Sequence, residues 1–251
     1  MSCVNIRGCC IGEGRPKVII PIVEPTETAV LEKAAEFSTL RADCVEWRID
    51  CFEGAKDLPA IVHCAAKLRV ALKDQLLLFT FRTKAEGGKA ALAHEEYLHF
   101  IRTVLATDCA DLIDIEFFTV GAELPALIEE AHTAGAAVVC SSHDFHKTPP
   151  RAELVSRMVA MQQAGANLPK LAVMPQSRAD VLELLAATAE MADRHPETPI
   201  ITMSMGALGA VSRLSGEALG SAMTFANPGQ ASAPGQVSLD IVNEVLDALH
   251  L

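Results

Sequence analysis

The chain has no long apolar run, and its acidic residues outnumber its basic ones. No stretch approaches the roughly 18 consecutive apolar residues of a membrane-spanning helix. Charged and polar side chains interrupt the first fifteen residues, so they do not resemble a secretory signal. Lysine and arginine number 21 against 32 aspartates and glutamates, a net charge of −11 at pH 7. This balance disfavours nucleic acid and anionic membrane surfaces as partners.

Short metal-binding and nucleotide-binding motifs are missing as well. None of the eight cysteines forms a Cys-x-x-Cys pair, which removes support for a zinc ribbon or a thioredoxin-like site. Cys44, Cys51 and Cys140 lie in or beside apolar runs, which indicates reduced, packed thiols in a cytoplasmic protein. The first predicted strand is followed by Glu-Pro-Thr rather than by a glycine-rich turn, so a nucleotide-binding open sheet is disfavoured.

What the chain does have is a regular alternation of strand and helix patterns. Hydrophobic residues make up 50% of the sequence, enough for a sizeable core. Eight strand starts follow one another at intervals of about 30 residues, as in right-handed βαβ units. The predicted strands are Val18–Val23, Cys44–Ile49, Leu76–Phe81, Leu112–Phe117, Ala137–Ser142, Lys170–Met174, Ile200–Met205 and Ala222–Phe225. The predicted helices are Glu27–Leu40, Leu58–Leu72, Ala93–Thr107, Glu123–Ala134, Arg151–Ala164, Arg178–Arg194, Leu208–Leu219 and Ser238–Leu249.

This rhythm favours an α/β fold in which residues 1–251 form a single (β/α)8 TIM barrel domain. Residues Ser2–Gly14 could add a short N-terminal hairpin that closes the bottom of the barrel. The low-complexity stretch Ala226–Gln236 follows the last strand on the catalytic face, where it is expected to act as a mobile lid.

Side-chain alternation along the strands predicts which residues face the barrel lumen. In the second strand Val45, Trp47 and Ile49 are expected to face the helices, which turns the intervening charged side chains inward. The same alternation, applied to the other strands, predicts that the following ionisable residues face the lumen: Glu46, Arg48, Arg82, Asp114, Glu116, His143 and Lys170. Burying so many such groups is unfavourable unless they are paired or used in catalysis.

Lys170 stands in an otherwise apolar strand. A desolvated ammonium has a lowered pKa, so the amine becomes available to attack a carbonyl group. Ala172, two residues on, leaves room for the long side chain to extend up the lumen. The alternative is a solvated lysine at the bottom rim, because catalytic residues of barrels usually sit at the opposite end of the strands.

Three further residues suggest acid–base chemistry and an anionic substrate. His143 directly follows the fifth strand, where an imidazole can move a proton, although a structural histidine is the alternative. Glu86 follows the third strand and could orient that ring, or be an exposed loop acid. Arg213 could clamp a carboxylate, or be a solvated helix charge. Arg48 and Arg82 add to a positive lining that suits a small anion.

Six ordered sequence blocks resemble the type I 3-dehydroquinate dehydratases of the shikimate pathway. The blocks are Glu46–Asp50, Leu78–Arg82 with Glu86–Gly88, Ser142–Pro149, Pro169–Gln176, Ile200–Met205 and Ala231–Gln236. The resemblance implies a (β/α)8 barrel that works as a homodimer without metal or organic cofactor. One departure is Pro21, where relatives often place a small hydroxyl residue that faces the substrate.

The resemblance also implies residue roles. Lys170 would form a Schiff base with 3-dehydroquinate, His143 would be the general acid and base, and Glu86 would orient His143. Arg213 would hold the substrate carboxylate. The remaining substrate-binding residues would be Glu46, Arg48, Arg82, Ser232 and Gln236, with Met203, Met205 and Phe225 as apolar walls.

Other readings of the same residues remain open. A class I aldolase-like barrel could use Lys170 to cleave a carbon–carbon bond. A metal-dependent isomerase could use Glu116, His143 and His146, although the spacing is loose for a metal site. A non-catalytic barrel could simply bind a metabolite. The sequence does not choose between aromatic amino acid biosynthesis and quinate breakdown as the pathway.

Overall fold

The parallel strands β3 to β10 form a closed ring. The structure is a computed structural model that describes residues 2–229 and 232–251. The strands of the ring are β3 (Lys17–Ile22), β4 (Cys44–Arg48), β5 (Leu76–Thr80), β6 (Leu112–Glu116), β7 (Ala137–Asp144), β8 (Leu168–Val173), β9 (Ile201–Ser204) and β10 (Met223–Asn227). Successive strands pair from β3 to β9, and β10 pairs with β3. The Ala222 N–H donates to the Ile200 carbonyl at 2.8 Å and closes the ring, so the predicted (β/α)8 barrel is confirmed.

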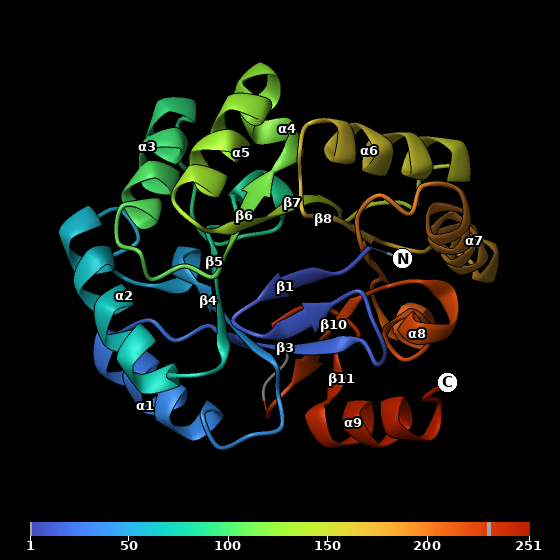
Figure 1. The fold of residues 1–251 in the computed structure, drawn as a ribbon, viewed down its shortest axis with the longest axis horizontal. Helices are drawn as coiled ribbons and strands as arrows, with labels where there is room; N and C mark the ends of the chain where they lie inside the picture. Colours follow the sequence, from blue (N-terminus) through green and yellow to red (C-terminus); the bar gives the residue numbers. More distant parts are fainter. Residues whose placement is uncertain (1, 230–231) are drawn as a thin grey trace.

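Helices surround this ring in chain order (Figure 1). The longer ones are α1 (Glu27–Phe37), α2 (Leu58–Leu72), α3 (His94–Leu105), α5 (Leu124–Thr133), α6 (Arg151–Gln163), α7 (Arg178–Arg194) and α9 (Leu239–Ala248). Side-chain caps begin two of them at the predicted residues: Asp57 accepts from Ala60 N before α2, and Ser177 accepts from Asp180 N before α7. In residues 2–229 and 232–251, none of the helices combines the length and the apolar character needed to cross a bilayer.

Two separate apolar layers confirm the predicted alternation along the strands. The outer layer, between strands and helices, contains Val45, Trp47 and Ile49. The lumen layer contains residues of opposite parity, such as Cys44, Leu78 and Ala172. The ionisable residues expected inside therefore lie on the lumen side of their strands, above an apolar floor.

A small antiparallel hairpin forms part of that floor, as predicted. It consists of β1 (Val4–Ile6) and β2 (Cys9–Ile11), and it crosses the centre of the barrel in the view of Figure 1. Ile11 is fully buried in the lumen layer. Arg7 donates to the Lys73 carbonyl at 3.0 Å, and the Ser2 hydroxyl donates to the Glu197 carbonyl at 2.7 Å. The hairpin is thus fastened to turns that precede the barrel strands.

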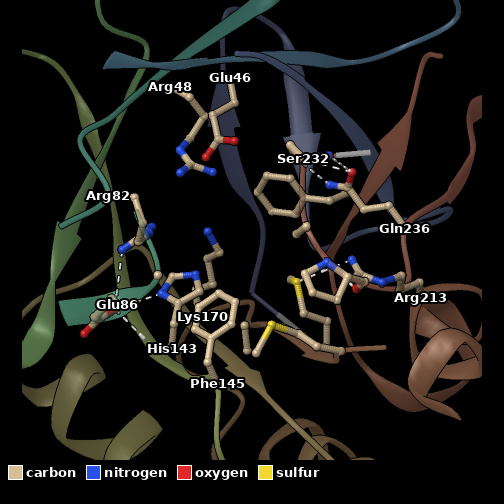
Figure 2. A pocket seen from close by; sticks show the side chains of 17 residues that line it. Glu46, Arg48, Arg82, Glu86, His143, Phe145, Lys170, Arg213, Ser232 and Gln236 are labelled. Atoms are coloured by element: carbon tan, nitrogen blue, oxygen red, sulfur yellow. Dashed lines mark hydrogen bonds and ion pairs between the residues drawn. The ribbon is translucent and has the colours of Figure 1, made fainter. Parts of the chain in front are cut away.

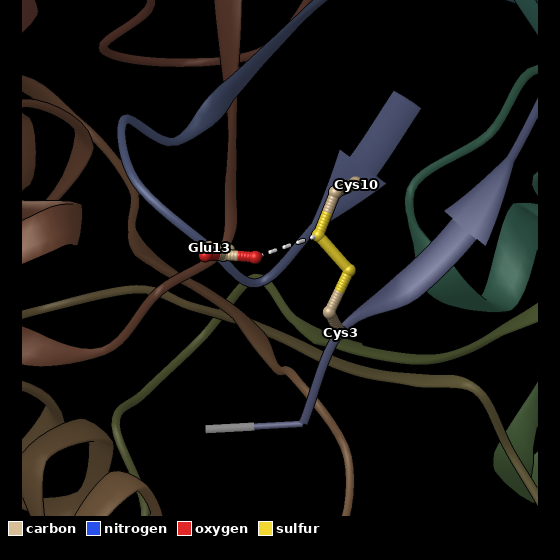
Figure 3. Close-up of side chains that lie close together, drawn as sticks. All are labelled: Cys3, Cys10 and Glu13. Atoms are coloured by element: carbon tan, nitrogen blue, oxygen red, sulfur yellow. Dashed lines mark hydrogen bonds between the residues drawn. A yellow bond between two sulfur atoms is a disulfide. The ribbon is translucent and has the colours of Figure 1, made fainter. Parts of the chain in front are cut away.

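A disulfide joins Cys3 to Cys10 at the edge of this hairpin (Figure 3). The sequence did not predict this bond. The Glu13 carboxylate lies 3.4 Å from the Cys10 sulfur. The three cysteines predicted as packed thiols, Cys44, Cys51 and Cys140, are free, which agrees with the prediction. The disulfide therefore links the segment before β1 to β2.

Reduction of the Cys3–Cys10 disulfide is expected to destabilise the protein without changing the active face. The two cysteines are seven positions apart, and closing so short a loop contributes about 2–3 kcal/mol. Dithiothreitol should lower the melting temperature of the oxidised protein by roughly 5–10 °C. The Cys3→Ser/Cys10→Ser double variant is the control, and it should melt at the lower temperature whether or not reductant is present. Equal melting temperatures for fully reduced and fully oxidised protein would contradict this expectation.

One predicted helix is wrong. Residues 208–219 do not form a single helix but a 3₁₀ segment, η4 (Ala207–Arg213), and a short helix, α8 (Gly216–Leu219). The Ser212 hydroxyl accepts from Ser204 N at 2.8 Å, which holds η4 tightly against β9. A Cβ at Gly209 would lie 2.3 Å from the Ser204 carbonyl oxygen, so only glycine permits this approach. The close packing places Arg213 at the end of η4, facing the barrel.

Candidate active site

A cavity of about 180 Å³ opens at the carboxyl ends of the barrel strands (Figure 2). Every residue predicted for the site contributes to its lining. These residues are Glu46, Arg48, Arg82, Glu86, His143, Lys170, Met203, Met205, Arg213, Phe225, Ser232 and Gln236. The structure therefore brings together side chains from β4, β7, β8, β9 and β10, from the segments after β5, β9 and β10, and from η4.

Lys170 lies in the middle of β8, and its side chain is only 4% exposed. The alternative of a solvated lysine at the bottom rim is therefore wrong. Its Nζ is 3.4 Å from Asp114 Oδ2 and 4.6 Å from the centre of the Phe225 ring. Burial lowers the pKa of Lys170 below its ordinary value, although the Asp114 carboxylate opposes that shift. A buried amine with a lowered pKa is a suitable nucleophile.

His143 lies on β7 beside that amine, and both side chains point into the same cavity (Figure 2). The His143 ring Nδ1 is 2.8 Å from Glu86 Oε2, which also accepts the His143 backbone N–H at 3.1 Å. Burial lowers the pKa of His143 well below its ordinary value, and the cations of Arg82 and Lys170 lower it further. The ring is therefore neutral at pH 7. In the tautomer whose Nδ1–H donates to Glu86, Nε2 is the nitrogen left to accept a proton from a ligand.

Glu86 is a buried residue at the end of η2 (Lys84–Glu86), not an exposed loop acid. Burial raises its pKa to about 8; the Arg82 cation opposes this rise, and the neighbouring carboxylates of Glu116 and Asp114 reinforce it. A carboxyl group that titrates near neutral pH can accept or return the proton of the ring it contacts. The 2.8 Å contact therefore joins two titratable groups at the wall of the cavity.

The three arginines of the cavity differ in their partners. Arg48 makes a bidentate pair with Asp50, at 2.8 and 2.9 Å. Arg82 donates to Glu116 at 2.9 Å and to Asp114 at 2.7 Å. These two guanidinium groups are therefore largely satisfied by the protein itself.

Arg213 is different because it is 2% exposed yet has no carboxylate partner in residues 2–229 and 232–251. One terminal nitrogen donates to the Pro234 carbonyl at 3.1 Å, and Nε has no partner. Burial lowers the pKa of Arg213 to about 10. A buried cation without a charged partner at a cavity wall can bind an anion.

The remaining lining residues complete the enclosure. The Thr80 hydroxyl donates to Glu46 at 2.8 Å. The Gln236 amide donates to the Ser232 hydroxyl at 3.0 Å, which ties the two lid residues together. Gln230 and Ala231 of the predicted lid lie outside the described residues, so a motion of Ala226–Gln236 stays a prediction.

This arrangement does not support the alternative of a metal site formed by Glu116, His143 and His146. Glu116 is bonded to Arg82, Thr83 and Thr119, and His143 to Glu86. Within the part of the chain that the structure describes, the only group with the spacing of metal ligands is Cys3, Cys10 and Glu13, on the hairpin. Glu116, His143 and His146 are not brought together.

The family is decided by comparison with known proteins. The family model described as type I 3-dehydroquinase matches residues 18–251. The chain belongs to the type I 3-dehydroquinase family. A protein of Bacillus subtilis named 3-dehydroquinate dehydratase is 47% identical over 250 residues, covering 100% of this chain and 98% of the relative. One from Salmonella typhimurium is 44% identical, covering 100% and 99%.

Solved structures of the same family have the same fold. The type I 3-dehydroquinate dehydratase of Clostridium difficile, described with covalent modified comenic acid, superposes with a TM-score of 0.96. It is 42% identical, covering 99% of this chain and 98% of that one. The Enterococcus faecalis 3-dehydroquinate dehydratase has a TM-score of 0.93 at 39% identity, covering 99% and 100%.

Some residues of this family member were not singled out from the sequence. Asp50, which fixes Arg48, also accepts the backbone N–H groups of Arg82 and Lys89 at 3.2 and 3.0 Å. Gly87 has φ +86°, and a Cβ there would lie 2.3 Å from the Phe145 ring that walls the cavity. Both residues belong to the sequence blocks that resemble the family. The resemblance was therefore the signal that could have identified them.

Pro21, the predicted departure, sits on β3 opposite Glu46. It does not line the active-site cavity but a second hollow, together with Lys33, Phe37 and Gly229. Pro21 has no side-chain hydroxyl group with which to bind a substrate.

Proposed function

We propose that this protein is a hydro-lyase that dehydrates 3-dehydroquinate to 3-dehydroshikimate through a Schiff base on Lys170. Membership of the family and the names of its relatives support the reaction. The observation that carries the mechanism is a buried amine with a lowered pKa beside a neutral imidazole. The covalently modified ligand described for the C. difficile relative is consistent with a nucleophile in such a site.

The proposed reaction begins with attack of the neutral Lys170 amine on the C3 ketone. The resulting carbinolamine takes up one proton and loses water to give an iminium ion. The iminium withdraws electrons and acidifies the C2 hydrogen, so His143 Nε2 can remove it and leave an enamine. His143 then returns the proton to the departing C1 hydroxyl, which leaves as water. Hydrolysis of the remaining iminium releases the ketone product and the free amine.

Substrate binding in this scheme depends on a difference between the arginines of the cavity. Arg48 and Arg82 are paired with carboxylates of the protein, whereas Arg213 has no such partner among the described residues. Arg213 holds the carboxylate of the substrate, because a charged ligand oxygen supplies that partner. Polar contacts to the substrate hydroxyls come from Glu46, Arg48, Arg82, Ser232 and Gln236. Met203, Met205 and Phe225 form the apolar wall.

Adding 3-dehydroquinate to the purified protein tests the proposed reaction. A conjugated enone should accumulate, seen as a rise in ultraviolet absorbance, and its rate should be unchanged after exhaustive chelation. The class I aldolase alternative predicts carbon–carbon cleavage products instead, which mass spectrometry of the reaction mixture distinguishes. A binding-only barrel predicts no change in absorbance.

Substituting Arg213 with alanine should mainly weaken substrate binding. Loss of a charge-assisted contact should raise KM by roughly 10- to 100-fold, with a smaller effect on kcat. Arg213→Lys keeps the charge but loses the planar fork, so it should lie between the alanine variant and the wild type. Steady-state kinetics on the three proteins measures this order. A KM within twofold of wild type for Arg213→Ala would remove its assignment as the anchor.

Assembly and pathway are further parts of the proposal that rest on the resemblance, and location is a part that rests on the free thiols of Cys44, Cys51 and Cys140. We expect a homodimer in the cytoplasm, acting on one small anionic substrate in the shikimate pathway. Light scattering coupled to gel filtration would give the assembly, with a monomer at micromolar concentration as the contradicting result.

A further inference from the structure

Asp114 is a buried carboxylate next to the reactive nitrogen, and the mechanism above gives it no role. It lies on β6, its side chain is fully buried, and its Oδ2 is 3.4 Å from Lys170 Nζ. A buried charge of this kind is unfavourable unless a partner compensates it. Its position therefore requires a cation in the centre of the barrel.

Two hydrogen bonds hold the Asp114 carboxylate in place. Arg82 donates to Oδ2 at 2.7 Å, and the Ser141 hydroxyl donates to Oδ1 at 2.7 Å. Burial alone would raise the pKa of Asp114, but Arg82 and Lys170 beside it keep that pKa below its ordinary value. The group is therefore ionised at neutral pH, and its two hydrogen bonds fix its orientation.

Arg82 does not neutralise the negative charge around Lys170 by itself. The same guanidinium group also pairs with Glu116 at 2.9 Å and with Glu86 at 3.4 Å. One cation thus faces three carboxyl groups, and Asp114 is the one that also contacts the amine. The Phe225 ring, 4.6 Å from Nζ, adds a second feature that favours positive charge on this nitrogen.

We propose that the Asp114 carboxylate is the counter-ion of the iminium ion formed on Lys170, held in position by Arg82 and Ser141. This inference rests on the proposed function. Formation of the iminium joins an amine, a ketone and one proton and releases one water, so the nitrogen becomes cationic. It is neutral in the enamine and cationic again before hydrolysis. Asp114 keeps its charge throughout and stabilises each cationic stage without exchanging a proton.

The test compares wild type with Asp114→Asn, which removes the charge at nearly constant size. Asp114→Ser is a second uncharged variant with room for a water molecule, to be used if the amide does not fold. Ser141→Ala is the matched control, because it removes a hydrogen bond to Asp114 but leaves the carboxylate charged. Circular dichroism and melting temperature establish which variants are folded.

The first readout is the rate at which Lys170 forms a borohydride-reducible adduct, both with 3-dehydroquinate and with acetaldehyde. Loss of the counter-ion should reduce this rate by roughly 10- to 100-fold in the uncharged variants and by less than about fivefold in Ser141→Ala. The experiment with acetaldehyde separates the proposed function from the proposed role of Asp114. Wild type that forms an adduct with acetaldehyde but not with 3-dehydroquinate would refute the proposed function, while the role of Asp114 would still be measured.

The second readout is the pH midpoint for acylation of Lys170 by a neutral ester, read by peptide mass spectrometry. The groups that face Nζ are Asp114 from β6, Glu46 from β4, Arg82 after β5 and His143 from β7. Removing the Asp114 charge should lower the midpoint by about one pH unit or more, because an anion beside an ammonium raises its pKa. A folded uncharged variant with adduct formation within threefold of wild type would overturn the proposal. An unchanged midpoint would do the same, because general damage to the site could slow adduct formation without moving it.

Discussion

Replacing Lys170 with alanine should lower kcat by roughly a factor of 10³ to 10⁶, the range expected when a covalent nucleophile is removed. The reason is chemical, since no other amine lines the cavity in the part of the chain that the structure describes. Without the iminium, the C2 hydrogen is acidified only by a ketone. The rate of enone formation measures the effect.

Lys170→Met is the matched variant for that experiment because it keeps much of the side-chain volume among Ala172, Met203 and Phe225. In both variants Asp114 keeps its pair with Arg82 at 2.7 Å, and circular dichroism establishes whether each variant is folded. Turnover within tenfold of wild type in either folded variant would contradict the nucleophilic role.

Replacing His143 with alanine should lower kcat by about 10²- to 10⁴-fold, the usual contribution of a positioned general acid and base. The Lys170 amine remains in place, so the variant should still form a reducible adduct and accumulate it during turnover. His143→Asn tests whether a polar group of similar size can substitute, and it should be similarly slow because an amide cannot accept the proton. Near-normal turnover without accumulation of the adduct would show that a residue other than His143 transfers the proton.

Much of the fold followed from the sequence because parallel strands in a barrel have a strict two-residue alternation. Trp47 and Ile49 packing outward require Glu46 and Arg48 to point inward, and the structure has this arrangement. The first residues of two helices, Leu58 and Arg178, were also predicted correctly, and each follows a side-chain cap, Asp57 or Ser177. Local chemistry decides both features, so local sequence is sufficient to predict them.

The features that the sequence did not yield depend on contacts between distant segments. Residues 208–219 have a helical pattern, but packing of Gly209 against Ser204 breaks them into two short pieces. The pairing of Cys3 with Cys10 depends on the register of a hairpin with no strong turn signal. The difference between a satisfied Arg82 and an unpaired Arg213 appears only when every neighbour is in place.

Trapping the covalent intermediate tests the central claim most directly. The wild-type protein would be mixed with 3-dehydroquinate, reduced with borohydride and digested, and the peptide containing Lys170 would be weighed. The account predicts that this peptide gains the mass of the reduced adduct on Lys170, in proportion to the activity lost. Full enone formation with no modified Lys170 peptide, or with the adduct on another residue, would contradict it.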